Sequence, residues 1–355
     1  MSAFLLLYNL KICYNNKKMI DSFFKKVFRL VDPKIKEVLD ISVDQKTKDL
    51  VNYQVSTGGK RLRPVLAVAS CLACRGKIKD VLYAAAGLEI LHNCTLIFDD
   101  IIDNSFLRRG RKTVWSKYGK SIAQCVGLDY TAAIFQAANR SVSGREISEL
   151  FANTMKKIIE GEILDILFEQ SGRQDEKYVA SNRYRKIAKK DYLEMISKKT
   201  ASLTEASCEA GAVCARAKKK ERRALKKYGF NLGMAFQIRD DILDIFGQES
   251  KFGKKIGKDI EEKKMGNIVI FYTLQELVSN KDKKRFMAIF MKNKVSRKDI
   301  KQAMALINKT RAKEKALVLE EKYASRAREG LQGLTSGKWK SFLAQIADFV
   351  VERNK

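Results

Sequence analysis

Apolar residues recur along most of the chain at intervals of three and four positions, the spacing that places them on one side of an α-helix. Long alternating, turn-rich stretches of the kind that form β-strands are absent, and the 355 residues include only two prolines. The pattern therefore predicts an all-α protein. We expect residues 1–19 to be an N-terminal extension, with Met19 as an alternative start, and residues 20–355 to form one domain, because no linker interrupts them.

An acidic motif ends one of the most apolar predicted helices, which runs from Val81 to Asp103. Asp99 and Asp103 are four residues apart and share a helix face, with Asp100 about 100° away. A second copy of this spacing, Asp240, Asp241 and Asp244, lies in another apolar helix. Buried carboxylates are costly unless a cation neutralises them. Two such helices facing each other would suit Mg²⁺, which binds carboxylates, waters and substrate phosphates.

A turn with two glycines and three cations precedes the first central helix. Gly58 and Gly59 permit a tight turn, and Pro64 fits the first turn of the helix that follows. Lys60, Arg61 and Arg63 stand between them, and cations on a rigid loop at a helix start are suited to holding a phosphate or diphosphate. An exposed basic turn without a ligand is the alternative for this motif alone.

Further candidates for phosphate binding flank the first acidic motif. His92 lies seven residues before Asp99, hence on nearly the same helix face, so both a ligand contact and an ordinary core histidine remain open. Arg108 and Arg109 follow the motif, where two guanidinium groups could grip phosphate oxygens beside the metal.

The net charge is +29, which invites a nucleic-acid-binding interpretation. Aromatic residues interleaved with basic ones, as base stacking requires, are not evident, so we expect no nucleic-acid partner and favour a lysine-rich solvated surface. The same charge would give loose attraction to anionic membrane surfaces. The seven cysteines are spread through apolar helices, and Cys71 and Cys74 form a lone pair without a histidine cluster, which favours reduced core thiols and a cytoplasmic location.

Several motifs in this order resemble those of the trans-isoprenyl diphosphate synthases, the polyprenyl synthetase family. The resemblance runs from about residue 20 to the C-terminus and includes the helix at residues 346–353. Its motifs are the glycine-cation turn at residues 58–64, the two aspartate-rich motifs, Arg108-Arg109-Gly110, the pair Lys199-Thr200, and Gln237. Each motif alone is weakly specific, but together they are strong.

The resemblance implies a single large helical bundle around a deep central cavity, usually a homodimer. The implied reaction is the 1′-4 condensation of an allylic diphosphate with isopentenyl diphosphate. Three Mg²⁺ ions would be bound by Asp99, Asp103 and Asp240, supported through water by Asp100, Asp241 and Asp244. By the same resemblance, Arg108, Lys199 and Lys254 would hold the allylic diphosphate; Lys60, Arg63, His92 and Arg109, beside Arg61, would hold isopentenyl diphosphate; and Thr200 and Gln237 would face the carbocation.

This chain departs from the family pattern at three places. Phe98 precedes the first aspartate where many members have histidine, and Glu162 stands where glutamine is common. Residues 262–267 differ from the usual closing loop, although Lys264 keeps a basic position. None of these departures removes a carboxylate that is expected to bind the metal directly.

Product length in the family depends on side chains one and two turns before the first aspartate. Here they are Leu91, Cys94 and Thr95. Because Cys94 is small, we expect geranylgeranyl diphosphate or a longer product, unless another helix forms the cavity floor. The alternatives are a weakly active partner subunit of a heteromeric synthase, a terpene cyclase, a nucleic-acid-binding protein and a structural scaffold. Two complete acidic motifs and the glycine-cation turn argue against each of them.

Overall fold

The computed structural model describes the backbone of residues 3–247, 257–292 and 294–352, and the side chains from Lys18 to Val351 within those ranges. In this part of the chain, the extended structure comprises two strands of two residues each and one isolated bridge between Glu169 and Lys264. The prediction of an all-α protein is therefore confirmed. The chain divides into two compact units, and each is described by itself below.

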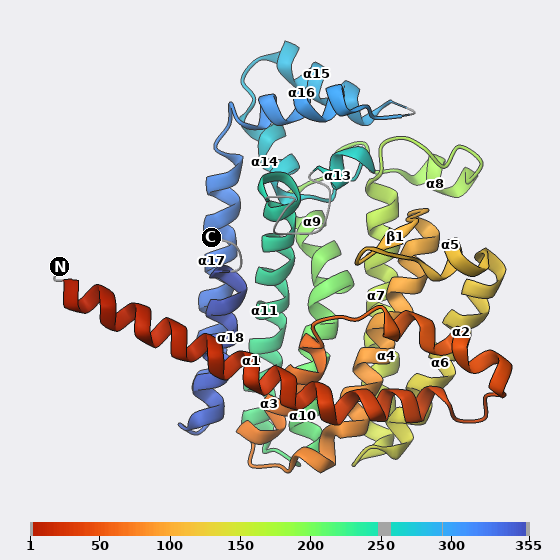
Figure 1. Cartoon of the computed structure of the whole chain (residues 1–355). Helices are drawn as coiled ribbons and strands as arrows, with labels where there is room; N and C mark the ends of the chain where they lie inside the picture. Colours follow the sequence, from red (N-terminus) through yellow and green to blue (C-terminus); the bar gives the residue numbers. More distant parts are fainter. Residues whose placement is uncertain (1–2, 248–256, 293, 353–355) are drawn as a thin grey trace. The chain divides into compact units, whose positions relative to one another are not determined.

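Unit 1 comprises Met1–Asn153, Thr204–Gly229 and Arg328–Phe349. Its first part carries one glycine-cation loop between two helices, at residues 57–61, and another between two short strands, at residues 109–110 (Figure 1). The elements in chain order are α1 (Ala3–Leu39), α2 (Gln45–Ser56), α3 (Leu62–Ala73), α4 (Ile78–Ile102), β1 (Leu107–Arg108), β2 (Arg111–Lys112), α5 (Val114–Tyr118) and α6 (Lys120–Arg140), followed by the beginning of α7 (Gly144–Phe168).

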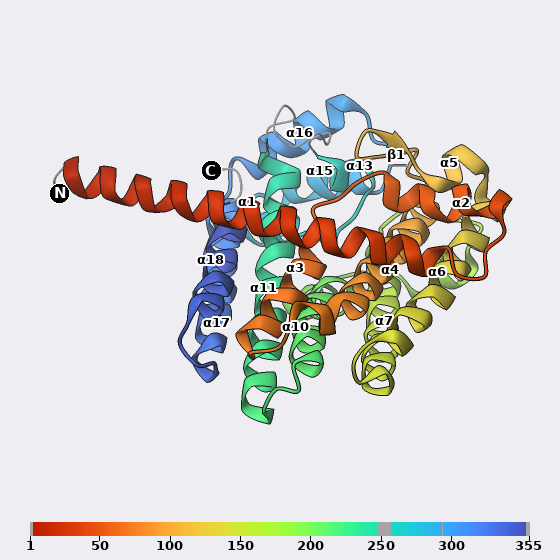
Figure 2. The ribbon, with the colours of Figure 1, turned by 60° about the horizontal axis from the view of Figure 1, so that its bottom comes forward.

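The predicted boundary at residue 20 falls inside α1, which Figure 2 shows as one unbroken helix. A single domain from residue 20 onward stays a prediction. Pro64 lies in the first turn of α3, as its position in the sequence predicted. The two helices that the sequence marked as central, α3 and α4, are indeed largely buried in unit 1.

The core of unit 1 is organised around α4, which packs against α1, α3 and α6. Gly87 makes this packing close, because an added Cβ would lie 2.6 Å from the Phe151 ring and 3.1 Å from the Ala137 methyl carbon. By length and composition α4 could cross a membrane, but 72% of its most apolar window is buried inside the protein. That degree of burial is typical of a central core helix.

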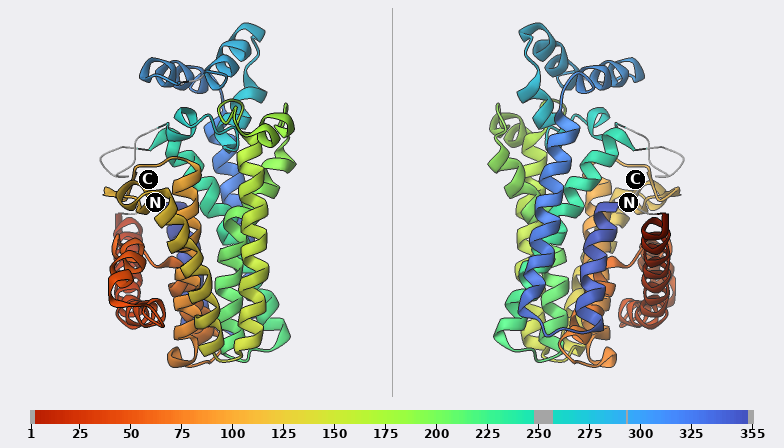
Figure 3. Two further views of the ribbon diagram at one scale, coloured as in Figure 1. Left: turned by 90° about the vertical axis from the view of Figure 1, so that its right-hand side faces the viewer. Right: turned by 90° about the vertical axis from the view of Figure 1, so that its left-hand side faces the viewer.

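Unit 2 comprises Thr154–Leu203, Phe230–Ala327 and Val350–Lys355. Figure 3 shows α15 and α16 side by side at one end of this unit. The described elements that lie wholly or partly in unit 2 are α7, α8 (Lys177–Asn182), α9 (Lys189–Ile196), the π-helix η1 (Ser197–Ala201), α10 (Ser202–Cys214), α11 (Lys219–Phe246), α13 (Lys258–Glu261), α14 (Ile268–Glu276), α15 (Asn280–Phe290), α16 (Arg297–Ile307), α17 (Ala312–Gly330) and α18 (Lys338–Glu352). The 3₁₀ turn η2 (Leu331–Gly333) belongs to unit 1.

The core of unit 2 gathers around the apolar helix α14, whose residues 268–273 are all buried. Asn267 caps this helix, because its side-chain oxygen accepts hydrogen bonds from the backbone N–H groups of Val269 and Ile270. Phe168 of α7 and Phe286 and Phe290 of α15 complete the same core. The second acidic motif is in α11, directly beside this core.

Candidate functional site

The turn between α2 and α3 requires glycine at position 59. Gly58 and Gly59 both have positive φ angles, of 90° and 149°. A Cβ at Gly59 would lie 2.9 Å from Nη1 of Arg109 and 3.0 Å from Nη1 of Arg61, so a larger residue would push the two guanidinium groups away. The turn therefore brings backbone and two cations close together, and Lys60 lies exposed on it.

Arg61 is a buried anchor of this turn, and its predicted contact with substrate stays a prediction. Its Nε donates to Asp32 at 3.0 Å and its Nη1 donates to Glu89 at 3.2 Å. It also donates to the carbonyl oxygens of Val55 and Gly58, both at 3.3 Å. Only 4% of Arg61 is exposed. Because two carboxylates and two carbonyls occupy its donors, we assign Arg61 the positioning of the turn.

The arginines of unit 1 lie close enough to His92 and to one another to shift their pKa values. Burial, and then the positive charges of Arg63, Arg109, Arg108 and Arg61, hold the pKa of His92 well below its ordinary value. Arg109 is exposed at its turn, but desolvation by its surroundings and the charges of the neighbouring arginines lower its pKa, while Glu89 opposes this. Guanidinium groups that lie this close repel one another, and a multiply charged anion bound between them would relieve the repulsion.

A tight hairpin presents Arg109 to this cluster. Leu107 pairs with Lys112 and Arg108 pairs with Arg111, which leaves Arg109 and Gly110 as the two turn residues. Both have positive φ angles, of 54° and 74°, as a type I′ turn requires. The sequence motif Arg-Arg-Gly thus has a local structural reason: the first arginine lies in a strand and the second forms the turn.

The three carboxylates of the first acidic motif have different surroundings. Asp100 is buried and binds Arg108, whose Nε donates to both carboxylate oxygens at 2.8 and 3.0 Å. Burial alone would lower the pKa of Arg108, but the hydrogen bond and charge of Asp100, with Asp99 and Asp103 adding theirs, raise it. Asp100 thus holds Arg108 in place, and its predicted role as water-mediated support for a metal stays a prediction. Asp99 and Asp103 are partly exposed at the end of α4.

The predicted chain-length residues lie on α4 near α6. Leu91 is fully buried, and Cys94 is 4% exposed, with its Sγ 3.4 Å from the Gly127 carbonyl oxygen. Thr95 donates a hydrogen bond to the carbonyl of His92 at 2.8 Å. Their influence on product length stays a prediction.

In unit 2, the Lys199-Thr200 pair lies in a π-helical turn between α9 and α10. Such turns are frequent at functional sites. Gly161 of α7 packs directly on this turn, because a Cβ there would come within 2.3 Å of the Lys199 backbone nitrogen. Lys199 Nζ lies 2.5 Å from Glu162 and 2.7 Å from Asp165. The unusual Glu162 thus gives Lys199 a second carboxylate partner.

Thr200 and Gln237, which were predicted to act together, form a hydrogen-bonded chain with Asp241. The Thr200 hydroxyl donates to Gln237 Oε1 at 2.7 Å, and Gln237 Nε2 donates to Asp241 at 2.9 Å. Asp241 is 3% exposed and also accepts from the Tyr192 hydroxyl and the Ile268 N–H. Like Asp100, the second aspartate of its motif, Asp241 binds protein groups, and its predicted role as water-mediated support for a metal stays a prediction.

The sequence did not mark Asp259 as a site residue, although the structure places it beside the second motif. Its backbone N–H donates to Asp244 at 3.1 Å, and its carboxylate accepts from Asn267 at 2.7 Å. Burial and the charge of Asp259 raise the pKa of Asp244 to about 8. The signal available in the sequence was the glycine-spaced segment Gly257-Lys258-Asp259 after the motif.

Carboxylates in this environment suit a divalent cation, since a metal would relieve the charge repulsion that raises their pKa values. Within the described residues, no three histidine, cysteine or carboxylate groups enclose a metal ion by themselves. This arrangement fits Mg²⁺, which commonly takes one or two carboxylates and completes its shell with water and substrate phosphates. Lys264 lies 3.9 Å from Asp165 and 3.3 Å from Glu262, while Lys254 falls outside the described residues.

These features define a class of all-α proteins in which aspartate-rich motifs accompany clusters of cations on glycine turns. A family model described as polyprenyl synthetase matches residues 44–307. The chain belongs to the polyprenyl synthetase family.

Relatives agree with this assignment over most of their length. A short chain isoprenyl diphosphate synthase from Methanocaldococcus jannaschii is 36% identical over 275 residues, covering 77% of this chain and 78% of that protein. A geranylgeranyl diphosphate synthase from Saccharolobus solfataricus is 34% identical over 342 residues, covering 94% and 98%. The crystal structure of geranylgeranyl pyrophosphate synthetase from Pyrococcus horikoshii matches with a TM-score of 0.83 at 29% identity, over 94% of this chain and 99% of that one.

Proposed function

We propose that this protein is a Mg²⁺-dependent trans-prenyltransferase that condenses an allylic diphosphate with isopentenyl diphosphate in a 1′-4 linkage. The observation that carries the proposal is the convergence of Arg63, Arg108, Arg109 and the neutral His92 beside the Gly58-Gly59 turn, with the pKa of Arg109 lowered by desolvation and by its neighbours. A diphosphate is the kind of multiply charged anion that such a cluster of guanidinium groups is suited to bind. Family membership supports the same reaction.

Isopentenyl diphosphate would bind to the cation cluster of unit 1. Arg63 and Arg109 would grip its diphosphate, His92 would donate a neutral hydrogen bond, and the exposed Lys60 would add charge at the rim. Arg61 would keep the turn in place through Asp32 and Glu89.

The allylic diphosphate would be bound by both acidic motifs through Mg²⁺. Asp99, Asp103, Asp240 and Asp244 are the residues we expect to hold the ions, three per site, with Asp259 as an added carboxylate. Bound Mg²⁺ would neutralise the charge that develops on the departing diphosphate. Fixed cations assist the same charge separation in a preorganised site; we assign this to Arg108, Lys199, Lys254 and Lys264.

Thr200 and Gln237 are suited to stabilising an allylic carbocation. Because the Thr200 hydroxyl donates its proton to Gln237, the remaining Thr200 lone pairs are acceptors only. Asp241 fixes the Gln237 amide by accepting from its nitrogen, so the amide oxygen keeps its orientation. The released diphosphate would take the final proton, and the side chains described above need not supply a base.

We further propose that the protein acts as a cytoplasmic homodimer that meets a partner copy through α6. Ile122, Cys125, Leu128 and Phe135 are exposed on one side of this helix, with 38%, 66% and 41% exposure for Ile122, Leu128 and Phe135. An apolar stripe of this kind is typical of a protein interface. The product would be geranylgeranyl diphosphate or longer, with a small side chain at Cys94 leaving room for elongation.

The experiment compares Arg109→Met with Arg111→Met, because both are exposed arginines of one hairpin and Arg111, on its second strand, donates to the Ser56 carbonyl oxygen at 3.3 Å. Initial rates of Mg²⁺-dependent diphosphate release are measured with each substrate varied in turn. We expect Arg109→Met to raise KM for isopentenyl diphosphate at least about 10-fold, since charge-assisted hydrogen bonds contribute about 1.5–3 kcal/mol. Arg111→Met should change it little. Equal effects of the two variants would contradict the assignment.

A further inference from the structure

Positive charge is concentrated in the segment that contains α15 and α16. Residues 280–315 hold 13 Lys+Arg and 3 Asp+Glu, a net charge of +10. This is about one third of the net charge of +29 in about one tenth of the chain. The segment therefore differs from a surface on which lysines are evenly spread.

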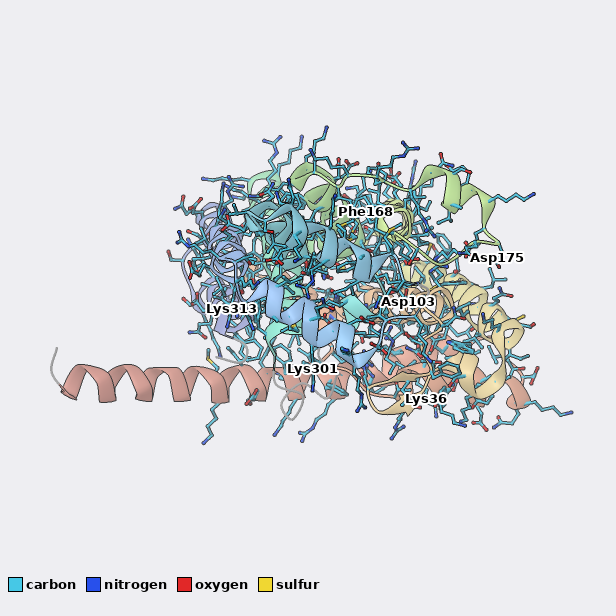
Figure 4. All side chains as sticks on the ribbon, turned by 90° about the horizontal axis from the view of Figure 1, so that it is seen from above. Lys36, Asp103, Phe168, Asp175, Lys301 and Lys313 are labelled. Carbon is cyan, nitrogen blue, oxygen red and sulfur yellow. The ribbon has the colours of Figure 1, made fainter. Side chains whose placement is uncertain are left out.

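The two acidic residues of α15 and α16 do not neutralise the positive charge on the exposed faces of these helices. Asp282 pairs with Lys309, and Asp299, which is 6% exposed, pairs with Lys292. Figure 4 looks down on α15 and α16 and labels Lys301. The outward-facing basic residues are all exposed, and within the described part of the chain no ion-pair partner is recorded for them: Lys281, Lys284, Arg285, Arg297, Lys298 and Lys301.

Two exposed apolar side chains flank α15. Val278, just before the helix, is 95% exposed, and Met291, directly after it, is 58% exposed. The aromatic residues of α15, Phe286 and Phe290, are fully buried. The face thus offers basic groups and apolar side chains, as interfacial membrane binding uses, and lacks the exposed rings on which nucleic-acid bases stack.

We propose that the outer face of α15 and α16, together with Val278 and Met291, binds anionic lipid membranes. Clusters of four to eight basic residues attract anionic lipids, and apolar side chains enter the headgroup region. The proposal deepens the proposed function, on which it rests for its rationale: an isoprenoid diphosphate with a long apolar chain is itself an amphiphile, and binding beside a bilayer would place the enzyme where that product partitions.

The test uses the full chain and sedimentation with phosphatidylcholine vesicles, with and without phosphatidylserine, at low and high salt. The patch variant carries Lys284→Glu, Lys298→Glu and Lys301→Glu. The control carries Lys218→Glu, Lys219→Glu and Lys220→Glu, three exposed lysines of unit 1, and changes the net charge equally. Circular dichroism and condensation activity in detergent verify that both variants are folded.

We expect the unmodified protein to bind phosphatidylserine vesicles at low salt and to release them at high salt. Since each basic residue contributes about fivefold to such binding, the patch variant should bind about 100-fold more weakly, and the control should stay within about threefold of the unmodified protein. Equal loss in both variants, or no binding by the unmodified protein, would overturn the proposal. So would loss of oligonucleotide binding in the patch variant with vesicle binding retained. Vesicle binding without any condensation activity would instead refute the proposed function.

Discussion

Glu162 stands where the family pattern given above has glutamine, and under the proposed function it would compete with the allylic diphosphate for Lys199. Lys199 Nζ lies 2.5 Å from Glu162 and 2.7 Å from Asp165, and all three side chains are largely buried, with exposures of 21%, 14% and 10% for Lys199, Glu162 and Asp165. A lysine that binds an allylic diphosphate must exchange these carboxylates for phosphate oxygens. Replacing Glu162 by Gln should therefore make Lys199 more available to the substrate.

The size of the effect follows from the geometry. At the 2.5 Å that separates Lys199 Nζ from Glu162, opposite unit charges interact by about 7 kcal/mol at an effective dielectric constant near 20. Only part of this is gained by the substrate, because Asp165 still holds Lys199 and the free ion pair is partly solvated. We expect a gain of about 1–1.5 kcal/mol in substrate binding, so KM for the allylic diphosphate should decrease by about 5–10-fold in Glu162→Gln.

The assay measures initial rates with the allylic diphosphate varied at saturating isopentenyl diphosphate. Glu194→Gln is the matched control: it removes the same charge from a partner of the neighbouring Lys198, with which Glu194 forms an exposed pair at 2.8 Å. This control should leave KM unchanged. The reasoning is refuted if Glu162→Gln leaves KM for the allylic diphosphate unchanged or raises it, or if both variants lower it equally.

Two further predictions concern His92 and the surface of α6. Burial and the nearby arginines keep the pKa of His92 far below its usual value near 6.5, so the profile of kcat/KM for isopentenyl diphosphate should lack a His92 inflection between about pH 6 and 8, and His92→Gln should keep the same profile. Below about pH 6.5 the unfolded chain binds a proton on this histidine, whereas the folded protein keeps it neutral. The stability that neutral His92 provides is therefore present above that pH and is lost as the pH falls. An inflection in the kcat/KM profile that disappears in His92→Gln would contradict the lowered pKa. Leu128→Glu places a charge on the apolar stripe of α6 and should shift the protein to a monomer in light scattering, whereas Val318→Glu, at a comparably exposed apolar side chain, should not. A Leu128→Glu dimer would exclude this face.

Much of the architecture was predictable because it follows from local patterns. Helical spacing gave the class of fold, and the bounds of α4 lie within a few residues of the predicted helix from Val81 to Asp103. The glycines of the turns were equally informative. Gly58, Gly59 and Gly110 all adopt positive φ angles, which glycine takes up more readily than other residues.

Side-chain roles were less predictable because they depend on residues distant in sequence. Spacing grouped Asp100 and Asp241 with their neighbours, but only the fold reveals Arg108 beside the first and Tyr192 beside the second. In the sequence, Arg61 and Arg63 are equivalent candidates for binding a phosphate. The fold shows that Arg61 donates a hydrogen bond to Asp32 of the first helix. Two residues of the same type in one motif can differ in burial, and that difference depends on the tertiary fold. The spacing of residues in the sequence does not reveal it.

The most direct test of the account incubates the folded protein with Mg²⁺, labelled isopentenyl diphosphate and each allylic primer in turn, and separates the products by chain length. The account predicts incorporation that stops at one product of geranylgeranyl length or longer and that ceases when the metal is chelated. No incorporation with any primer, in protein shown to be folded, would contradict the central claim and favour a partner subunit of a heteromeric synthase; a product of only farnesyl length would contradict the role assigned to Cys94.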